Sequence, residues 1–381
     1  MREYVLVILV AASVTYLLCS LARELAVRIG AVAQVRDRDV HAIPIPYFGG
    51  VAMLGGFLVA VLVAWSLPFL GGVGTEQMYD DVFWVMLGGA VVCLVGVVDD
   101  VFELDAVTKL AGEVVAGGIV VVGGVQFYWL PLPGAGSTPF VLEGSQAALL
   151  SLLLIVGTVN AVNFVDGLDG LASGVVLIGA VAFFAYAYII AASNNLERSS
   201  PAALLTAALI GVCLGLLPHN FYPARMFMGD SGALLIGFML ACAAIAFTGQ
   251  YDVTSLDQGP GGASISVAPA LLPLVLPVAI LVVPFLDMAL AVVRRTRAGR
   301  SPFAPDKQHL HHRLLEIGHS HRRAVLLMYL WASLVAFGAV LVSLFTGWQS
   351  VAGLAVMLLV AVVLTFGVPW GRRAAQQRTS L

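Results

Sequence analysis

The chain has 381 residues, of which 60% are hydrophobic and only 11% charged, with a formal net charge of −3 and a mean hydropathy of +0.98. A soluble domain carries roughly 25% charged residues, so this composition excludes an ordinary soluble protein and indicates an integral membrane protein. The four cysteines lie in apolar stretches without a CxxC pair, which favours buried thiols over disulfides or a zinc site.

Eleven stretches are apolar and long enough to approach the roughly 20 residues that a membrane-spanning helix needs. The predicted fold is therefore an all-α polytopic membrane protein with about 11 transmembrane helices in a single domain, residues 1–381. The third and fourth stretches are short, as a tilted or partly re-entrant helix would be. The spans are expected at 4–22, 46–69, 82–98, 109–124, 146–163, 171–192, 201–218, 231–248, 269–292, 324–346 and 349–369.

The basic residues define an orientation. If the loop after the first span is cytosolic, all of the 19 lysines and arginines except Arg2 and Arg198 fall on the cytosolic side. The N-terminus is then outside and the C-terminus cytosolic, and apolar runs around 131–134 predict a small extracytoplasmic β-hairpin. Cytosolic catalytic loops are expected at about 23–45, 99–108, 164–170, 219–230 and 294–323.

Five carboxylates lie at the predicted cytosolic ends of spans: Asp99, Asp100, Asp166, Asp169 and Asp230. Acids are costly near a bilayer, so they favour a functional role. Adjacent carboxylates also repel one another unless a cation lies between them. Acids from separate stretches on one face therefore predict a magnesium site for a phosphorylated substrate. The alternatives are a solvated helix end at Asp99 and Asp100 and a helix N-cap at Asp230.

Four polar residues recur every three positions as the fifth span leaves the membrane: Asn160, Asn163, Asp166 and Asp169. At this spacing, residues on a helix are near neighbours on successive turns. Helix capping explains one of these residues, but not four in register. The spacing therefore predicts a ladder of polar groups that faces the site.

Two basic elements accompany the acids. Lys109 is placed to pair with the acids or to bind phosphate, and a helix salt bridge with Glu113, four residues later, is the alternative. The segment 294–323 holds eight Lys or Arg and five His. Its imidazoles are compatible with zinc, but the acids lie elsewhere, so we favour His and Arg as donors to phosphate oxygens. The central residues of this kind are His309, His311, His312 and Arg313.

Together and in this order, these motifs resemble the polyprenyl-phosphate N-acetylhexosamine-1-phosphate transferase superfamily, from about His41 to Arg313. The resemblance depends on Asp99-Asp100 with Lys109, on the segment 163–169, on Gly229-Asp230 and on the His-rich loop. The sequence His-Leu-His-His-Arg at 309–313 is similar to the branch that uses UDP-GlcNAc. The phospho-MurNAc-pentapeptide branch usually has three consecutive histidines, and eleven spans also fit the first branch better.

The resemblance implies transfer of GlcNAc-1-phosphate from UDP-GlcNAc to a membrane polyprenyl phosphate, with Mg²⁺ or Mn²⁺ as cofactor. It places the reaction at the cytosolic face of a bacterial plasma membrane, as the first membrane step of a cell-envelope polysaccharide pathway. It further implies a homodimer and no nucleic-acid partner. The implied metal ligands are Asp230 and Asp100, the catalytic residues Asp99, Asp100 and Asp166, and the substrate-binding residues Lys109, Asn163, Asp169, Asn220, His309, His311, His312 and Arg313.

The chain departs from the family pattern at Glu113, where the family commonly shows Gln, and at Tyr47, where many relatives have a basic residue. Two other classes of protein share some of these features. An intramembrane prenyltransferase also uses an Asp-rich magnesium site, but it leaves the polar ladder and the His-rich loop unexplained. A transporter keeps its polar residues near the middle of the membrane, whereas the acids here lie at helix ends.

Overall fold

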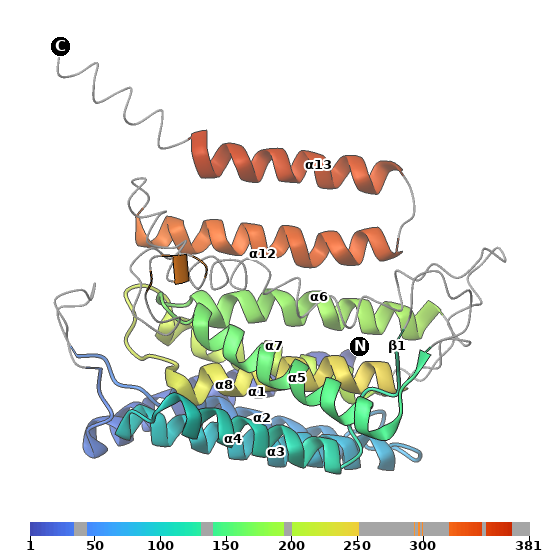
Figure 1. Cartoon of the computed structure of the whole chain (residues 1–381), viewed down its shortest axis with the longest axis horizontal. Coiled ribbons are helices and arrows are strands. Elements are labelled where there is room, and N and C mark those ends of the chain that lie inside the picture. The colour runs from blue at the N-terminus through green and yellow to red at the C-terminus, as the bar shows by residue number, and fades with distance from the viewer. Residues whose placement is uncertain are drawn as a thin grey trace.

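The structure is a computed structural model that describes residues 1–33, 44–130, 140–193, 200–250, 293, 296–297, 299, 320–344 and 348–367. Long helices lie side by side with roughly parallel axes, and α12 and α13 form the outer layers on one side of the bundle (Figure 1). The elements are α1 (Arg2–Ile29), α2 (Gly49–Trp65), α3 (Glu76–Phe102), α4 (Ala106–Val122), β1 (Trp129–Leu130), β2 (Phe140–Val141), α5 (Gly144–Val165), α6 (Leu171–Ser193), α7 (Pro201–Asn220), α8 (Gly229–Gln250), α12 (His321–Leu344), α13 (Trp348–Val362) and the π-helix η2 (Val363–Gly367).

Within the described ranges, seven helices are long and apolar enough to cross a membrane, and two shorter apolar helices lie at Gly49–Trp65 and Ala352–Thr365. The prediction of a polytopic, all-helical membrane protein is confirmed, while the predicted ninth span at 269–292 lies outside the described residues. The third span is longer than predicted. Hydropathy placed it at 82–98, whereas α3 has 27 residues, because its first turns carry acids that hydropathy scores as loop.

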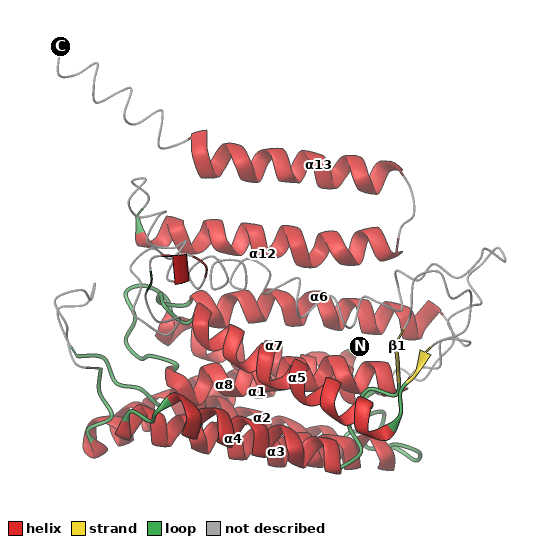
Figure 2. Cartoon of the chain, in the orientation of Figure 1, coloured by secondary structure: helices red, strands yellow, loops and turns green. Residues whose placement is uncertain are grey.

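The predicted hairpin is present. β1 pairs with β2 in antiparallel register, with Trp129 opposite Val141 and Leu130 opposite Phe140. It lies at the end of the bundle opposite the loop that joins α7 to α8 (Figure 2).

Capping residues mark the starts of α4 and α5. Glu143 forms a capping box at the start of α5, and Asp105 accepts hydrogen bonds from the first-turn amides of α4.

The centre of the bundle is α8, which packs against α2, α3, α5, α6 and α7. Its sequence has polar groups at the first turn and then an apolar run rich in Ala and Leu, as expected of a helix that is buried all round. Residues 233–247 are all buried. The polar first turn of α8 therefore projects from a rigid core, at the end of the bundle where α3 and α5 finish and α4 begins.

Gly96 allows α3 to approach the start of α8 closely. A Cβ atom at Gly96 would overlap the backbone of Ser231, the residue after Asp230. The absence of a side chain on α3 therefore sets the distance between Asp230 and the last turn of α3.

We expect Gly96→Ala to destabilise the protein by about 1–3 kcal/mol, because the added methyl group forces packed backbone apart. Thermal unfolding in detergent measures this change. Gly118→Ala on α4 is the matched control, since nothing lies within 4 Å of the position of its Cβ. The control should be neutral or slightly stabilising, because alanine favours a helix over glycine. Equal unfolding temperatures for the two variants would contradict this account of Gly96.

Candidate active site

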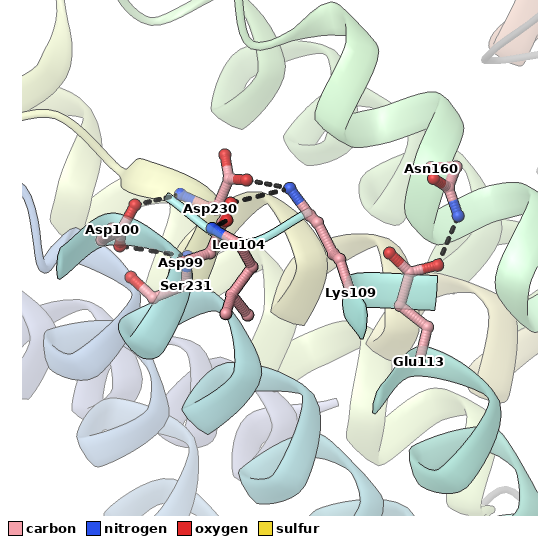
Figure 3. Close-up of polar contacts among 8 residues, drawn as sticks. All are labelled: Asp99, Asp100, Leu104, Lys109, Glu113, Asn160, Asp230 and Ser231. Carbon is pink, nitrogen blue, oxygen red and sulfur yellow. Dashed lines mark hydrogen bonds and ion pairs between the residues drawn. The ribbon is translucent and has the colours of Figure 1, made fainter. Parts of the chain in front are cut away.

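The first turn of α8 is held by a carboxylate from another helix. Asp100, in the last turn of α3, accepts hydrogen bonds from the backbone N–H of Asp230 at Oδ1 (2.8 Å) and of Ser231 at Oδ2 (3.3 Å) (Figure 3). The first amides of a helix lack partners within the helix and attract negative charge, so an acid is stabilising there. Gly229 precedes them with a φ of 70°, where a side chain would collide with Asp100. Asp100 and Asp230 are thereby fixed beside each other.

Lys109 links three helices at this point. Its Nζ donates to Asp99 Oδ2 (3.1 Å) and to Asp230 Oδ2, so an ammonium from α4 lies between carboxylates from α3 and α8. Asp99 is held from its other side, because its Oδ1 accepts the backbone N–H of Leu104 (2.7 Å). The Lys109 and Asp99 side chains are only 15% and 14% exposed. Low solvent access strengthens this ion-pair cluster.

Asn163, on α5, completes the cluster. With its amide oriented to suit its neighbours, its nitrogen donates to Asp230 Oδ1 (3.1 Å) and its oxygen accepts from Lys109 Nζ (2.8 Å). Predicted site residues from four helices therefore lie together: Asp99, Asp100, Lys109, Asn163 and Asp230.

A second polar layer lies behind the first. Asn160, one turn before Asn163 on α5, donates through Nδ2 to Glu113 Oε2 and to the carbonyl oxygen of Val156 (2.9 Å). The alternative of a Lys109–Glu113 salt bridge is wrong in this structure, because Lys109 pairs with Asp99 and Asp230. The spacing along α4 puts Glu113 within reach of Lys109. The packing of α3 and α8 around this end of α4 brings Asp99 and Asp230 to the same ammonium, and Lys109 pairs with these two acids.

The polar ladder is interrupted after Asn163, because α5 ends at Val165. Asp166 lies in the turn that follows. Desolvation and the nearby charges of Asp230, Asp100 and Asp169 raise its pKa to about 8, so a cation close to Asp166 would favour the ionised carboxylate.

Asp169 and Asn220 stabilise loops. Asp169 is buried, and its Oδ2 accepts the backbone N–H of Ala224 (2.9 Å). Asn220 is also buried, accepts from the N–H of Gly170 (3.1 Å) and donates to the carbonyl oxygen of Met226 (3.1 Å). Both side chains therefore tie the α5–α6 turn to the α7–α8 loop. Their predicted substrate contacts stay a prediction.

Sequence reasoning missed the backbone pairing that supports the α7–α8 loop. The N–H of Phe227 donates to the carbonyl oxygen of Pro46 (2.9 Å), and the N–H groups of Gly49 and Gly50 donate to the carbonyl oxygens of Phe227 (3.2 Å) and Met228 (3.1 Å). The Pro-Gly composition of 44–50 signalled a rigid turn, but not the loop against which it packs. This pairing fixes the backbone leading into Asp230.

The start of α12 also contacts this end of the bundle. Arg322 Nε donates to the carbonyl oxygen of Tyr222 (3.3 Å), and Tyr329 OH donates to the carbonyl oxygen of Gly170. Arg322 lies at the end of the His-rich segment 294–323, and Tyr329 follows that segment in α12. Within that loop His309, His311, His312 and Arg313 lie outside the described residues.

Carboxylate oxygens are the ligands that hard divalent cations prefer. Asp99, Asp100, Asp166 and Asp230 supply such oxygens at one end of the bundle. Within the described ranges, no three His, Cys, Asp or Glu side chains are grouped so that they could hold a metal ion. In this arrangement the Lys109 ammonium lies between the carboxylates of Asp99 and Asp230.

The helices and this cluster define a multi-pass membrane protein with a charged site at one end of its bundle. The profile of glycosyl transferase family 4 matches residues 82–248, which include every acid of the cluster. A decaprenyl-phosphate N-acetylglucosaminephosphotransferase of Mycolicibacterium smegmatis is 46% identical over 376 residues, 98% of this chain and 90% of the relative. The Mycobacterium tuberculosis protein of the same name has the same identity and coverage.

A more distant similarity extends beyond these species. A probable undecaprenyl-phosphate N-acetylglucosaminyl 1-phosphate transferase of Bacillus subtilis is 29% identical over 92% of this chain and 88% of its own length. The chain belongs to glycosyl transferase family 4 and is a membrane transferase, as the sequence motifs predicted.

Proposed function

We propose that the protein transfers GlcNAc-1-phosphate from UDP-GlcNAc to a polyprenyl phosphate. An oxygen of the lipid phosphate forms a bond to the sugar-bearing phosphorus of UDP-GlcNAc, and the bond from this phosphorus to the oxygen of UMP breaks. The products are polyprenyl diphosphate-GlcNAc and UMP. The observation that carries the proposal is the 46% identity, over nearly the full length, to relatives named for this lipid and sugar phosphate.

The charged cluster suits this chemistry. Two anions must approach each other, so neutralisation of phosphate charge is the main task of the site. Lys109 offers a cation that is already desolvated in the first turn of α4, and Asn163 and Asp99 orient it. We assign Asp166, in the turn after α5, to accept a proton from the lipid phosphate or to orient that phosphate.

The donor set also fits Mg²⁺, since it consists of carboxylate oxygens. We assign Asp230 as the main ligand with Asp100 and Asp99 beside it, and Mg²⁺ would supply charge neutralisation on the phosphates. Asp100 retains lone pairs for this purpose while it accepts the α8 amides. For Asp230 and Asp99 to bind the ion together, Lys109 must leave its position between them.

We further propose that the cluster faces the cytosol. Arg28, Arg225 and Arg322 lie at the same end of the bundle as the cluster, since the helix end or loop that carries each of them is at that end. The start of α3, at the opposite end, is acidic. This asymmetry follows the preference of basic residues for the cytosolic side.

A single incubation tests the function. Purified protein in detergent is given UDP-GlcNAc, UDP-MurNAc-pentapeptide, Mg²⁺ and decaprenyl phosphate, and the lipid product is identified by mass spectrometry. We expect decaprenyl diphosphate-GlcNAc and an equimolar amount of UMP. A lipid carrying MurNAc-pentapeptide would move the protein to the other branch of the superfamily. Uptake of UDP-sugar into vesicles without any lipid product would identify a transporter instead.

A further inference from the structure

Glu113 is a buried acid that the proposed reaction does not use. It lies on α4, only 1% of its surface is exposed, and its Oε2 accepts the amide of Asn160. Its other oxygen, Oε1, is buried and has no hydrogen-bond partner within the part of the chain that the structure describes. A buried polar atom without a partner is costly in either protonation state, so such an atom calls for an explanation.

The cation nearest in sequence on the same helix is Lys109. Residues four apart on a helix are neighbours on one face, and a lysine ammonium on its flexible stem can reach either way along that face. Figure 3 shows the Lys109 side chain extending from α4 towards Asp99 and Asp230, with Glu113 and Asn160 on its other side. Lys109 therefore stands between the pair Asp99 and Asp230, which it contacts, and the single acid Glu113.

A divalent cation and this ammonium compete for the same oxygens. An ion bound to Asp230 and Asp99 would repel Lys109 at close range in a site with little solvent. Asp100 would face the same ion, because it lies beside Asp230 at the start of α8. On α4 itself, Glu113 is one turn from Lys109, and its Oε1 is an oxygen without a hydrogen-bond partner in the described part of the chain that could accept the displaced ammonium.

We propose that Glu113 is a positioning residue that receives the Lys109 ammonium when a divalent cation binds Asp230 and Asp99. The inference rests on the proposed metal-dependent transfer. In this account Lys109 exchanges between two counter-ions, and the Glu113–Asn160 hydrogen bond holds the second counter-ion in place. Glu113 thereby lowers the free energy required to open the cation site, without touching substrate.

The test is a double-mutant cycle on the binding of Mn²⁺ alone to the full chain in detergent, with free Mn²⁺ measured by electron paramagnetic resonance. The four proteins are the wild type, Glu113→Gln, Lys109→Met and the double variant. Glutamine keeps the shape and the acceptor for Asn160, and removes only the charge. We expect Glu113→Gln to weaken Mn²⁺ binding about tenfold when Lys109 is present, and less than about twofold in the Lys109→Met background. Size-exclusion profiles check that each variant is folded.

Several results would overturn the proposal. If Glu113→Gln weakens Mn²⁺ binding by the same factor with and without Lys109, Glu113 has a general electrostatic or structural role. If the substitution leaves Mn²⁺ binding unchanged in both backgrounds, Glu113 takes no part in the cation site. Wild-type binding that Asp230→Asn leaves unchanged would place the ion elsewhere. Absence of Mn²⁺ binding by the wild type would also count against it, because the exchange requires an ion before substrate arrives. Product formation from UDP-GlcNAc tests the proposed function separately, so the two failures can be told apart.

Discussion

Replacing Asp230 with asparagine is expected to lower the rate of GlcNAc-1-phosphate transfer by on the order of 10³-fold, because it removes the main carboxylate from the proposed cation site. Asparagine has the same shape and leaves the backbone N–H that Asp100 accepts, so α8 should still start at Gly229. Initial rates of labelled lipid formation, measured at saturating Mg²⁺, give the size of the loss. The unfolding temperature should change little.

The matched control is Asp105→Asn, the same chemical change at an acid that lies near the cluster but outside it. Asp105 caps α4 through the amides of Val107 and Thr108, and asparagine is an equally good N-cap. This variant should retain at least about half of the wild-type rate. A comparable loss in the two variants would mean that the transfer rate responds to net charge at this end of the bundle, and the assignment of Asp230 would fall.

The convergence of Asp99, Asp100 and Asp230 could be predicted from sequence because topology constrains it strongly. Each apolar span has two ends, and the distribution of basic residues indicates which ends lie on the cytosolic side. Three acids at helix ends on one side of a compact bundle have few places to lie. The hydrogen bonds between Asp100 and the start of α8 confirm that Asp100 and Asp230 lie together.

The pairing within the cluster could not be predicted, because it depends on how helices pack. Lys109 is four residues from Glu113 and ten from Asp99, yet the packing of α8 against α3 brings Asp99 and Asp230 to its ammonium. The end of α5 at Val165 depends on the following turn, so the regular spacing of polar residues overstated the length of the ladder. Spacing along one helix carries no information about the neighbouring helix.

The roles of Asp169 and Asn220 show a related limit. Both belong to motifs that resemble those of the superfamily, and both are buried with backbone partners in the loops around the site. A motif records which residues occur together, but not whether a side chain contacts substrate or holds the backbone that does. Only the hydrogen-bond partners separate these two contributions.

Lys109→Met is expected to change two measurements in opposite directions. Without the competing ammonium, Asp230 and Asp99 should bind a divalent cation about tenfold more tightly, because a nearby like charge has been removed. Transfer of GlcNAc-1-phosphate should nevertheless fall by about 10²-fold, because a desolvated cation that neutralises phosphate has been lost.

Opposite signs are informative here because a misfolded or loosened site would weaken ion binding and turnover together. The two measurements are Mn²⁺ binding in the absence of substrate and the initial rate at an ion concentration that saturates each protein. Lys109→Arg, which keeps the charge, should leave the ion affinity within about threefold of the wild type. If Lys109→Met instead weakens the binding of Mn²⁺, the ammonium supports the cation site through structure, and the competition between the two cations is refuted.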